Sequence, residues 1–280
     1  MNAARYSQPT PVASPGVCWR ILASVGISAR SHWCEARHAV AVIGTALYTG
    51  VQPRFWTRAV RAAFSHQVMA IGIEPLLFVG ALAVFVGISV VVQLSSWIGA
   101  AGQSQLLGPV LVTVVARELG PVLMNLVVIV RSGSAMTTEL GVLKIDGDVR
   151  ALEAEGSDVF RQLVVPRVLG MAVSTFCLTI VFIFVAFASG YFFAALTGHG
   201  SRDLFLFVDT VSRAVQPKDV LNIVAKSILP ALFASACCCI GGLGVGKSVA
   251  DIPPATQRAL TRSVAGLFVI SAVVSLLTYL

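Results

Sequence analysis

The sequence predicts an all-α integral membrane protein, and three observations support this prediction. Hydrophobic residues make up 56% of the 280 residues and charged residues only 12%, whereas soluble domains carry about 25% charged residues. No charged residue occurs from Pro75 to Ala116, about twice the length that one helix needs to cross a bilayer. No stretch is polar enough for a soluble domain of appreciable size, so we expect any large catalytic domain to be on another chain.

Five membrane-spanning helices are expected. Small and polar residues at 95–105 divide the long uncharged stretch into two spans joined by a tight turn. Hydropathy then places the spans at about 70–93, 106–130, 166–196, 220–243 and 263–280. The third is longer than a bilayer requires, which indicates a tilted helix or one that extends beyond the bilayer.

The segment before the first span is expected to contain a leader and interfacial helices. Residues 1–30 are rich in Pro, Ser and Ala near their start and lack a convincing signal peptide, so we expect a disordered cytoplasmic leader followed by one domain at 31–280. Interfacial helices are expected at 36–66, because Arg54, Arg58 and Arg61 recur about one turn apart with aromatic residues between them. A short re-entrant or soluble helix is the alternative.

Basic residues predict the orientation of the chain in the membrane. Fifteen Lys and Arg residues lie before residue 67 or in the connections 131–167 and 244–262, and only three lie in the connections on the other side. Cytoplasmic segments carry the excess of Lys and Arg. We therefore expect a cytoplasmic N-terminus and an extracytoplasmic C-terminus.

Arg117 and Glu118 lie side by side near the middle of the predicted span 106–130. A charge at the centre of such a helix costs at least a few kcal/mol, so we expect both side chains to face a protein interior or polar cavity, where each offsets the other's charge. This pair either lines a transport pathway or only fixes helix packing. Lys226 in the fourth span and Glu74 at the start of the first are further pathway candidates. The alternatives are that Lys226 extends to the interface and that Glu74 is only interfacial.

The connection 146–165 contains five of the thirteen acidic residues. Its apolar residues recur at helical spacing, and Gly156 interrupts them, so we expect two short helices with a bend. A short amphipathic helix between two spans offers a docking surface to a cytoplasmic partner. A solvated linker is the alternative.

Residues 241–248, Gly-Gly-Leu-Gly-Val-Gly-Lys-Ser, match the G-x-x-x-x-G-K-[ST] phosphate-loop pattern. Such a loop binds phosphate between a β-strand and a helix, whereas this one follows a predicted span. We expect the glycines to end the fourth span and Lys247 to mark the cytoplasmic face. Consecutive helix residues point about 100° apart, so Cys237, Cys238 and Cys239 cannot converge on one metal ion. Packing is their expected role, and neither a metal site nor a catalytic residue is predicted.

Ordered motifs along the chain resemble one family of permeases. They are Ala116-Arg117-Glu118-Leu119-Gly120-Pro121, Arg131-Ser132-Gly133-Ser134-Ala135, Glu139-Leu140-Gly141, Ala151-Leu152-Glu153, Leu163-Val164-Val165-Pro166-Arg167 and Arg258-Ala259-Leu260-Thr261-Arg262. In these motifs and their order, the chain resembles the MlaE/YrbE-type permeases, the membrane subunits of ABC transporters that work with MCE proteins. The resemblance covers about residues 36–280.

This resemblance implies a homodimer with an N-terminal interfacial helix and five spans per subunit, and no enzymatic activity on this chain. A coupling helix at about 146–160 would sit in a groove of a cytoplasmic ABC ATPase, which alone would bind ATP and Mg. A periplasmic MCE-domain protein would complete the assembly. The coupling residues would be Asp148, Leu152, Glu153, Gly156, Asp158 and Arg161.

The implied substrate is a lipid, and the implied location is the inner membrane. The function that the resemblance implies first is phospholipid transport between the inner and outer membranes. Such transport affects the lipid asymmetry of the outer membrane. Sterol or fatty-acid import by the same kind of permease is the alternative. A secondary transporter is less favoured, because the two halves of the chain show no internal repeat. No nucleic-acid partner is expected.

Overall fold

The computed structural model describes residues 37–52, 56–101, 110, 112–156, 158–197, 209, 212–213, 216–246 and 248–279. The chain divides into two parts, residues 1–38 and residues 39–280. The predicted leader at residues 1–30 lies outside the described residues. All of the long helices belong to the second part.

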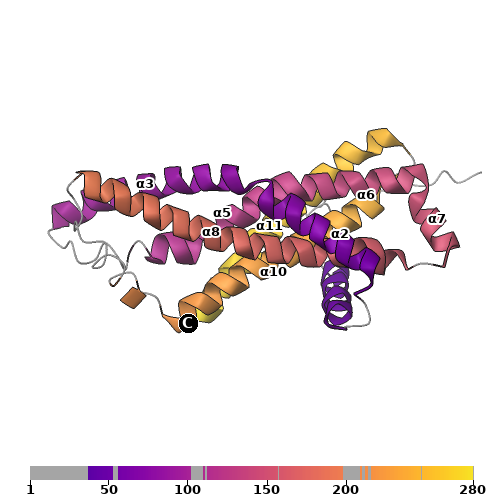
Figure 1. Cartoon of the computed structure of the whole chain (residues 1–280), viewed down its shortest axis with the longest axis horizontal. Helices are drawn as coiled ribbons and strands as arrows, with labels where there is room; N and C mark the ends of the chain where they lie inside the picture. The colour runs from indigo at the N-terminus through magenta and orange to yellow at the C-terminus, as the bar shows by residue number, and fades with distance from the viewer. Residues whose placement is uncertain are drawn as a thin grey trace, which may run out of the picture. The chain divides into compact units, whose positions relative to one another are not determined.

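The described residues form helices and contain no β-strand. Five helices are long and apolar enough to cross a membrane (Figure 1). They cover Arg58–Leu94, Val112–Asp146, Phe160–Leu196, Pro217–Leu243 and Val249–Tyr279. The protein is therefore a multi-pass membrane protein, and the predicted all-α fold with five spans is confirmed.

Three of these helices contain π-helical turns, in which the backbone is wider than in an α-helix. The first helix consists of α2 (Arg58–Val68), the π-helical η2 (Met69–Ile73) and α3 (Leu76–Ala101). The second consists of η4 (Val112–Leu119), α5 (Gly120–Val128), η5 (Ile129–Gly133) and α6 (Ser134–Asp146). The short α7 (Asp148–Ala154) leads to the third, which consists of η6 (Phe160–Val164) and α8 (Val165–Thr197). The fourth is α10 (Pro217–Leu243), and the fifth is η7 (Val249–Asp251) with α11 (Ile252–Tyr279).

The helices extend farther than hydropathy predicts. The span predicted to end at residue 130 continues as one helix to Asp146, and the first long helix begins at Arg58, inside the predicted interfacial segment 36–66. Within that segment, one helix runs from residue 37 to residue 51 and the chain leaves helical conformation before α2. Hydropathy identifies the apolar part of a span, whereas backbone hydrogen bonds continue past charged residues.

The helix α10 lies against four others, α5, α6, α8 and α11. Its buried residues include the small side chains of Ala231, Ala234 and Cys238, which allow neighbouring helices to approach closely. The hydroxyl of Thr137 on α6 donates a hydrogen bond to the carbonyl of Cys238 at 3.2 Å. The burial of Cys238 and Cys239 agrees with the packing role expected from the sequence.

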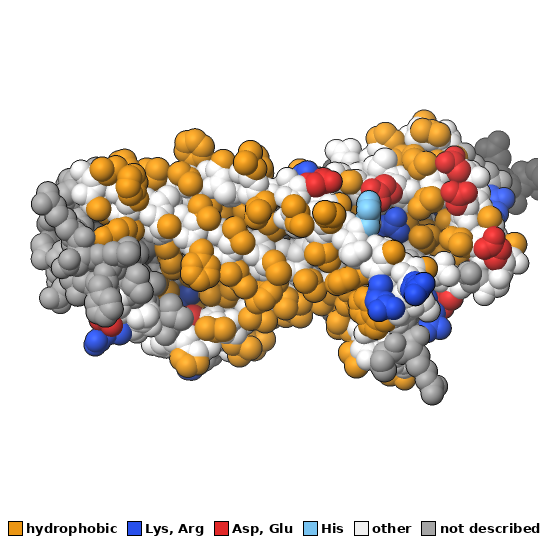
Figure 2. Space-filling model, in the orientation of Figure 1, with side chains coloured by type: hydrophobic (Ala, Val, Ile, Leu, Met, Phe, Trp, Pro, Cys, Tyr) orange, Lys and Arg blue, Asp and Glu red, His pale blue; other side chains and the backbone are white. Residues whose placement is uncertain are grey.

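The outer surface carries many exposed apolar side chains. Leu77 on α3, Phe184 on α8 and Leu277 on α11 are 88%, 72% and 78% exposed. Figure 2 shows hydrophobic side chains over α3 and α8, and charged side chains gathered toward the end where α6 and α7 lie. Apolar exposure on this scale is unfavourable in water and suits a surface that faces lipid.

Gly87→Ala is expected to weaken the packing of α3 on α8. A Cβ at position 87 would overlap the carbonyl oxygen of Ala186 and the hydroxyl of Ser189, and the carbonyl cannot move without shifting α8. Overpacking of this kind costs about 1–3 kcal/mol. Gly80→Ala, on the same helix, adds a Cβ with nothing within 4 Å. Thermal unfolding of the purified protein should show a lower Tm for Gly87→Ala only, and equal Tm values would contradict this reading.

Candidate functional site

Two ion pairs connect the second span to the fourth. The Arg117 guanidinium binds the Asp219 carboxylate: Nη2 donates to Oδ2 at 2.9 Å, and Nε lies 2.8 Å from Oδ1. Lys226 Nζ donates to Glu118 Oε1 at 2.6 Å. The expectation that Arg117 and Glu118 offset each other's charge is therefore wrong. Consecutive helix residues point about 100° apart, and each of the two finds a separate partner on α10.

The two ion pairs share one pattern of exposure. The side chains of Asp219 and Lys226 are 1% and 0% exposed, whereas those of Arg117 and Glu118 are 19% and 50% exposed. Each pair thus joins a buried partner on α10 to a more accessible partner on η4. The Lys226 ammonium group is buried beside Glu118 and does not reach the surface of the described residues.

Polar residues of α10 and α11 surround these pairs. We define the paired-charge cluster as Arg117, Glu118, Asp219, Asn222, Lys226, Ser275 and Tyr279. The Tyr279 hydroxyl donates to Asp219 Oδ1 at 3.0 Å, and the Arg117 Cζ lies 5.3 Å from the Tyr279 ring centroid. The Ser275 hydroxyl donates to Glu118 at 3.1 Å. Asn222 Nδ2 donates to the Arg117 carbonyl at 3.3 Å, while its buried Oδ1 has no hydrogen-bond partner among the described residues.

Sequence reasoning missed four members of this cluster, which are Asp219, Asn222, Ser275 and Tyr279. It places Asp219 in the connection 197–219, but α10 begins at Pro217, and Asp219 accepts a hydrogen bond from the backbone N–H of Gln216 at 2.8 Å. A signal was present in the spacing. Asp219, Asn222 and Lys226 stand at i, i+3 and i+7, and residues so spaced share one face of a helix.

The paired-charge cluster lies near one end of the spans, not at their centre. Arg117 contacts Asp219 and Tyr279. Asp219 lies in the first turn of α10, and Tyr279 is the last residue of α11. Arg117 thus contacts residues near the ends of α10 and α11, whereas the sequence places it near the middle of its own predicted span. The connecting helix α7 lies toward the other end of the long helices (Figure 1).

Charged residues of this protein recur at its π-helical turns. Arg117 and Glu118 belong to η4, Arg131 belongs to η5, Arg161 belongs to η6, and Glu74 directly follows η2. Such turns appear often at functional sites. Their recurrence next to charges supports a functional role for these positions.

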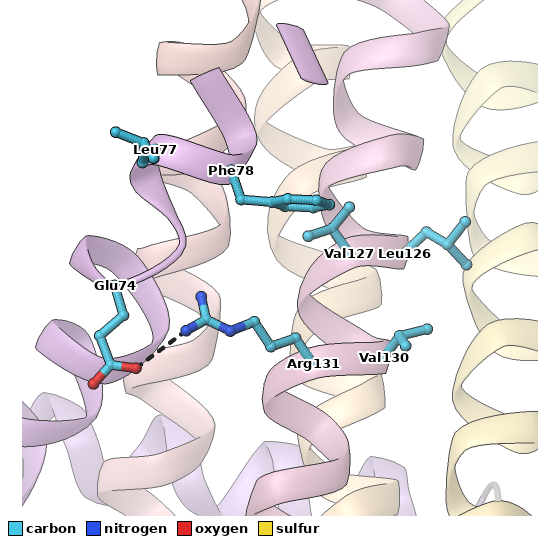
Figure 3. Close-up of a pocket in the computed structure, with 7 residues that line it drawn as sticks. All are labelled: Glu74, Leu77, Phe78, Leu126, Val127, Val130 and Arg131. Carbon is cyan, nitrogen blue, oxygen red and sulfur yellow. Dashed lines mark hydrogen bonds and ion pairs between the residues drawn. The ribbon is translucent and has the colours of Figure 1, made fainter. Parts of the chain in front are cut away.

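Glu74 lies outside the paired-charge cluster. Its Oε2 accepts a hydrogen bond from Arg131 Nη2 at 3.2 Å, and the two side chains are 63% and 45% exposed (Figure 3). Fourteen residues separate Arg117 from Arg131 on the second helix, a distance of roughly 21 Å along its axis. The four predicted pathway residues thus form two separate sites.

A pocket of about 400 Å³ opens between α3 and the second helix. Its lining residues are Phe85, Val86, Ser89, Val90, Leu119 and Leu123. Glu118 precedes Leu119 in the chain but contacts Lys226 and Ser275 on α10 and α11, so the pocket and the carboxylate lie on different sides of the second helix. Apolar walls beside a few polar groups suit a ligand that is itself amphiphilic.

The predicted coupling residues lie in and just after α7. They are Asp148, Leu152, Glu153, Gly156, Asp158 and Arg161, and all except the partly buried Leu152 are exposed. Gly147 and Gly156, with φ of 91° and 75°, adopt left-handed conformations on either side of α7, which glycine does without strain. Asp158 Oδ1 accepts a hydrogen bond from the backbone N–H of Phe160 at 3.1 Å. The segment therefore presents a short helix with sharp turns at both ends.

Lys144, just before this segment, binds the end of α10. Its Nζ donates to the carbonyls of Leu243 at 2.7 Å and Val245 at 2.6 Å. The last carbonyls of a helix have no partner within the helix, and a cation there also interacts favourably with the helix dipole. This contact joins α6 to the same helix that carries Asp219 and Lys226.

The phosphate-loop-like residues 241–248 do not follow a β-strand. Gly241 and Gly242 belong to α10, Gly244 caps that helix, and Lys247 lies outside the described residues. A Cβ at position 242 would lie 2.7 Å from the carbonyl oxygen of Thr137, so helix packing explains this glycine. The expectation that the glycines end the fourth span is confirmed.

Comparisons with known proteins agree with this architecture. Residues 64–277 match the family model described as Permease MlaE. The chain is 28% identical over 192 residues to the chloroplastic protein TRIGALACTOSYLDIACYLGLYCEROL 1 of Arabidopsis thaliana, a match that covers 68% of this chain and 54% of that protein. It is 26% identical over 200 residues to the "Probable ABC transporter permease protein" of Rickettsia prowazekii, covering 71% and 76% of the two chains. It is also 26% identical over 200 residues to the intermembrane phospholipid transport system permease protein MlaE of Haemophilus influenzae, covering 70% and 75%.

Proposed function

Because the chain belongs to the MlaE permease family, we propose that it is the membrane-spanning subunit of an ABC transporter that moves phospholipids between the inner and outer membranes. The observation that carries this proposal is the paired-charge cluster, in which Arg117 and Glu118 remain partly exposed within a multi-pass membrane protein. The relative from Haemophilus influenzae, an intermembrane phospholipid transport permease by name, supports the same substrate class.

The geometry suggests how a phospholipid is handled. A headgroup phosphate reaching the partly exposed Arg117 competes with Asp219 for the guanidinium, which binds phosphate through paired hydrogen bonds. Glu118 repels the phosphate and favours its release. A neutral sterol needs no such cation, so the charges favour a phospholipid over the sterol alternative.

The partners of this subunit follow from the same proposal. A cytoplasmic ABC ATPase binds ATP and Mg and seats the exposed helix α7, a second copy of this chain completes the permease, and an MCE-domain protein docks at the periplasmic end. The N-terminus then lies in the cytoplasm and the paired-charge cluster toward the periplasm. The excess of basic residues around α7 supports this orientation.

Reconstitution tests the proposed function. The chain and its ATPase are placed in vesicles that contain fluorescent phospholipids, and ATP-dependent transfer to an MCE-domain acceptor is measured. Transfer is expected only with the ATPase and ATP. Transfer by this chain alone would favour a secondary transporter, and ATP-dependent transfer of sterol in place of phospholipid would favour the import alternative.

Glu153→Lys is expected to weaken binding of the ATPase. The residue is exposed on α7, and reversing its charge alters the surface predicted to enter the ATPase groove. Gln257→Lys, exposed on α11, introduces a cation outside α7 and serves as the control. Co-purification should fall about tenfold for Glu153→Lys and remain at the wild-type level for Gln257→Lys. An intact complex with coupled ATP hydrolysis in Glu153→Lys would remove this residue from the interface.

A further inference from the structure

Two pockets of opposite character meet at the Glu74–Arg131 ion pair. An apolar pocket of about 640 Å³ is lined by this pair together with Leu77, Phe78, Leu126, Val127 and Val130. A second pocket of about 230 Å³ is also lined by the pair, and its other lining residues include the polar His66, Gln67, Ser132 and Glu139. The surface therefore changes from polar to apolar across the two charges.

Figure 3 shows how close the charges and the apolar surface are. The ion pair joins Glu74, between η2 and α3, to Arg131 in η5, and the Phe78 ring points from α3 toward Val127. Val127 and Arg131 are four residues apart on the second helix, so the apolar surface begins about one helical turn, or about 5 Å, from the charges. A ligand with a charged head directly attached to apolar chains matches this arrangement.

The two charges match a zwitterionic headgroup. Arg131 can bind a phosphate through charge-assisted hydrogen bonds, and Glu74 can accept hydrogen bonds from an ammonium group. Their ion pair is 3.2 Å long and largely exposed, and exposed pairs contribute little to stability. A ligand can therefore separate the two side chains without a large penalty.

The position of the pair along the second helix also fits a lipid. Glu74 directly precedes the uncharged stretch from Pro75 to Ala116, and Arg131 directly follows the uncharged residues 119–130, so both charges lie at the edge of an apolar segment. Arg131 thus lies near one boundary of the bilayer. The connections at that end carry the excess of Lys and Arg, which indicates the cytoplasmic boundary.

We propose that Glu74 and Arg131 form a binding site for the headgroup of a zwitterionic phospholipid in the cytoplasmic leaflet. The phosphate binds Arg131, the ammonium group binds Glu74, and one acyl chain lies along Phe78 and Val127. The site is separate from the paired-charge cluster. The inference rests on the proposed phospholipid transport and adds a headgroup class and a second binding position.

Binding is measured on the complex of the full chain with its ATPase, titrated with tail-labelled phosphatidylethanolamine or phosphatidylglycerol. The wild type should prefer phosphatidylethanolamine. Glu74→Gln should weaken phosphatidylethanolamine binding about tenfold and leave phosphatidylglycerol binding unchanged, whereas Arg131→Gln should weaken both. Asp209→Asn, which breaks an exposed ion pair with Arg213 outside both pockets, should change neither.

An unchanged ratio of the two lipids in Glu74→Gln would overturn this site. Because both side chains are exposed, the variants should keep the wild-type Tm, which is measured alongside. If a single variant unfolds, the exchanged variant Glu74→Arg/Arg131→Glu provides the test. It keeps the ion pair and should keep the preference for phosphatidylethanolamine. Loss of that preference in the exchanged variant counts against the site. Two results together would refute this site alone: the wild-type complex transfers phospholipid, and all variants bind both lipids as the wild type does. A wild-type complex that transfers no phospholipid refutes the proposed function.

Discussion

Arg117→Ala is expected to abolish phospholipid transfer and to destabilise the protein. Asp219 is 1% exposed and would lose its cation, and breaking a buried ion pair by removing one partner costs about 3–5 kcal/mol. Transport and stability would therefore fall together. Transfer is measured in vesicles with the ATPase present, and stability is measured as Tm.

The double variant Arg117→Gln/Asp219→Asn separates these two effects. Both side chains become neutral and remain able to form hydrogen bonds, so most of the stability should return, whereas transfer should stay at least tenfold below wild type because the phosphate has lost its cation. Arg213→Ala, which breaks the exposed Arg213–Asp209 pair, is the matched control. Wild-type transfer by the double variant would show that the charge of Arg117 is not part of the pathway.

Glu118→Ala is expected to lower the Tm more than Lys226→Met does, although both break the same 2.6 Å contact. Without Glu118, the fully buried Lys226 ammonium retains only the Arg117 carbonyl at 3.3 Å as a partner among the described residues. Without Lys226, the half-exposed Glu118 retains the Ser275 hydroxyl and can be hydrated. Leaving a charge buried and unpaired costs about 3–5 kcal/mol, whereas an exposed charge needs little compensation.

Ser275→Ala provides the reference for this comparison. It removes one hydrogen bond from Glu118, a contribution of about 0.5–1.5 kcal/mol, and should lower the Tm least of the three variants. Thermal unfolding of the purified variants in one detergent gives the order directly. If Lys226→Met were as unstable as Glu118→Ala, burial of the ammonium group would not be the dominant cost.

The five spans could be predicted from the sequence because apolar length alone identifies them. The ends of the helices could not. The second helix passes Arg131 and Glu139 without interruption, and these residues contact Glu74 and Arg167 on neighbouring helices at 3.2 and 3.5 Å. A charged residue marks where the membrane ends, but here it does not mark where the helix ends.

The candidate residues could be predicted, but their pairing could not. Arg117, Glu118 and Lys226 stand out because charges are rare in apolar spans. Which of them meet depends on how the helices are rotated about their axes, and this rotation is set by packing between distant segments. Arg117 and Asp219 are 102 positions apart. The face shared by Asp219, Asn222 and Lys226 was the one local pattern that pointed toward the actual arrangement.

The contact of Lys144 with the last carbonyls of α10 links α6 to the end of that helix. In the proposed assembly, force applied to α7 by the ATPase would reach α10 at the same end. With 27 residues, α10 is about 40 Å long, so a tilt of about 5° would displace its far tip by about 3.5 Å. Lys226 lies 17 residues before Leu243, or about 25 Å from the end bound by Lys144, so the same tilt would displace it by about 2.2 Å, close to the 2.6 Å length of its contact with Glu118. In the proposed assembly, a small tilt of α10 about the end near α7 would thus lengthen the Lys226–Glu118 ion pair far from that end.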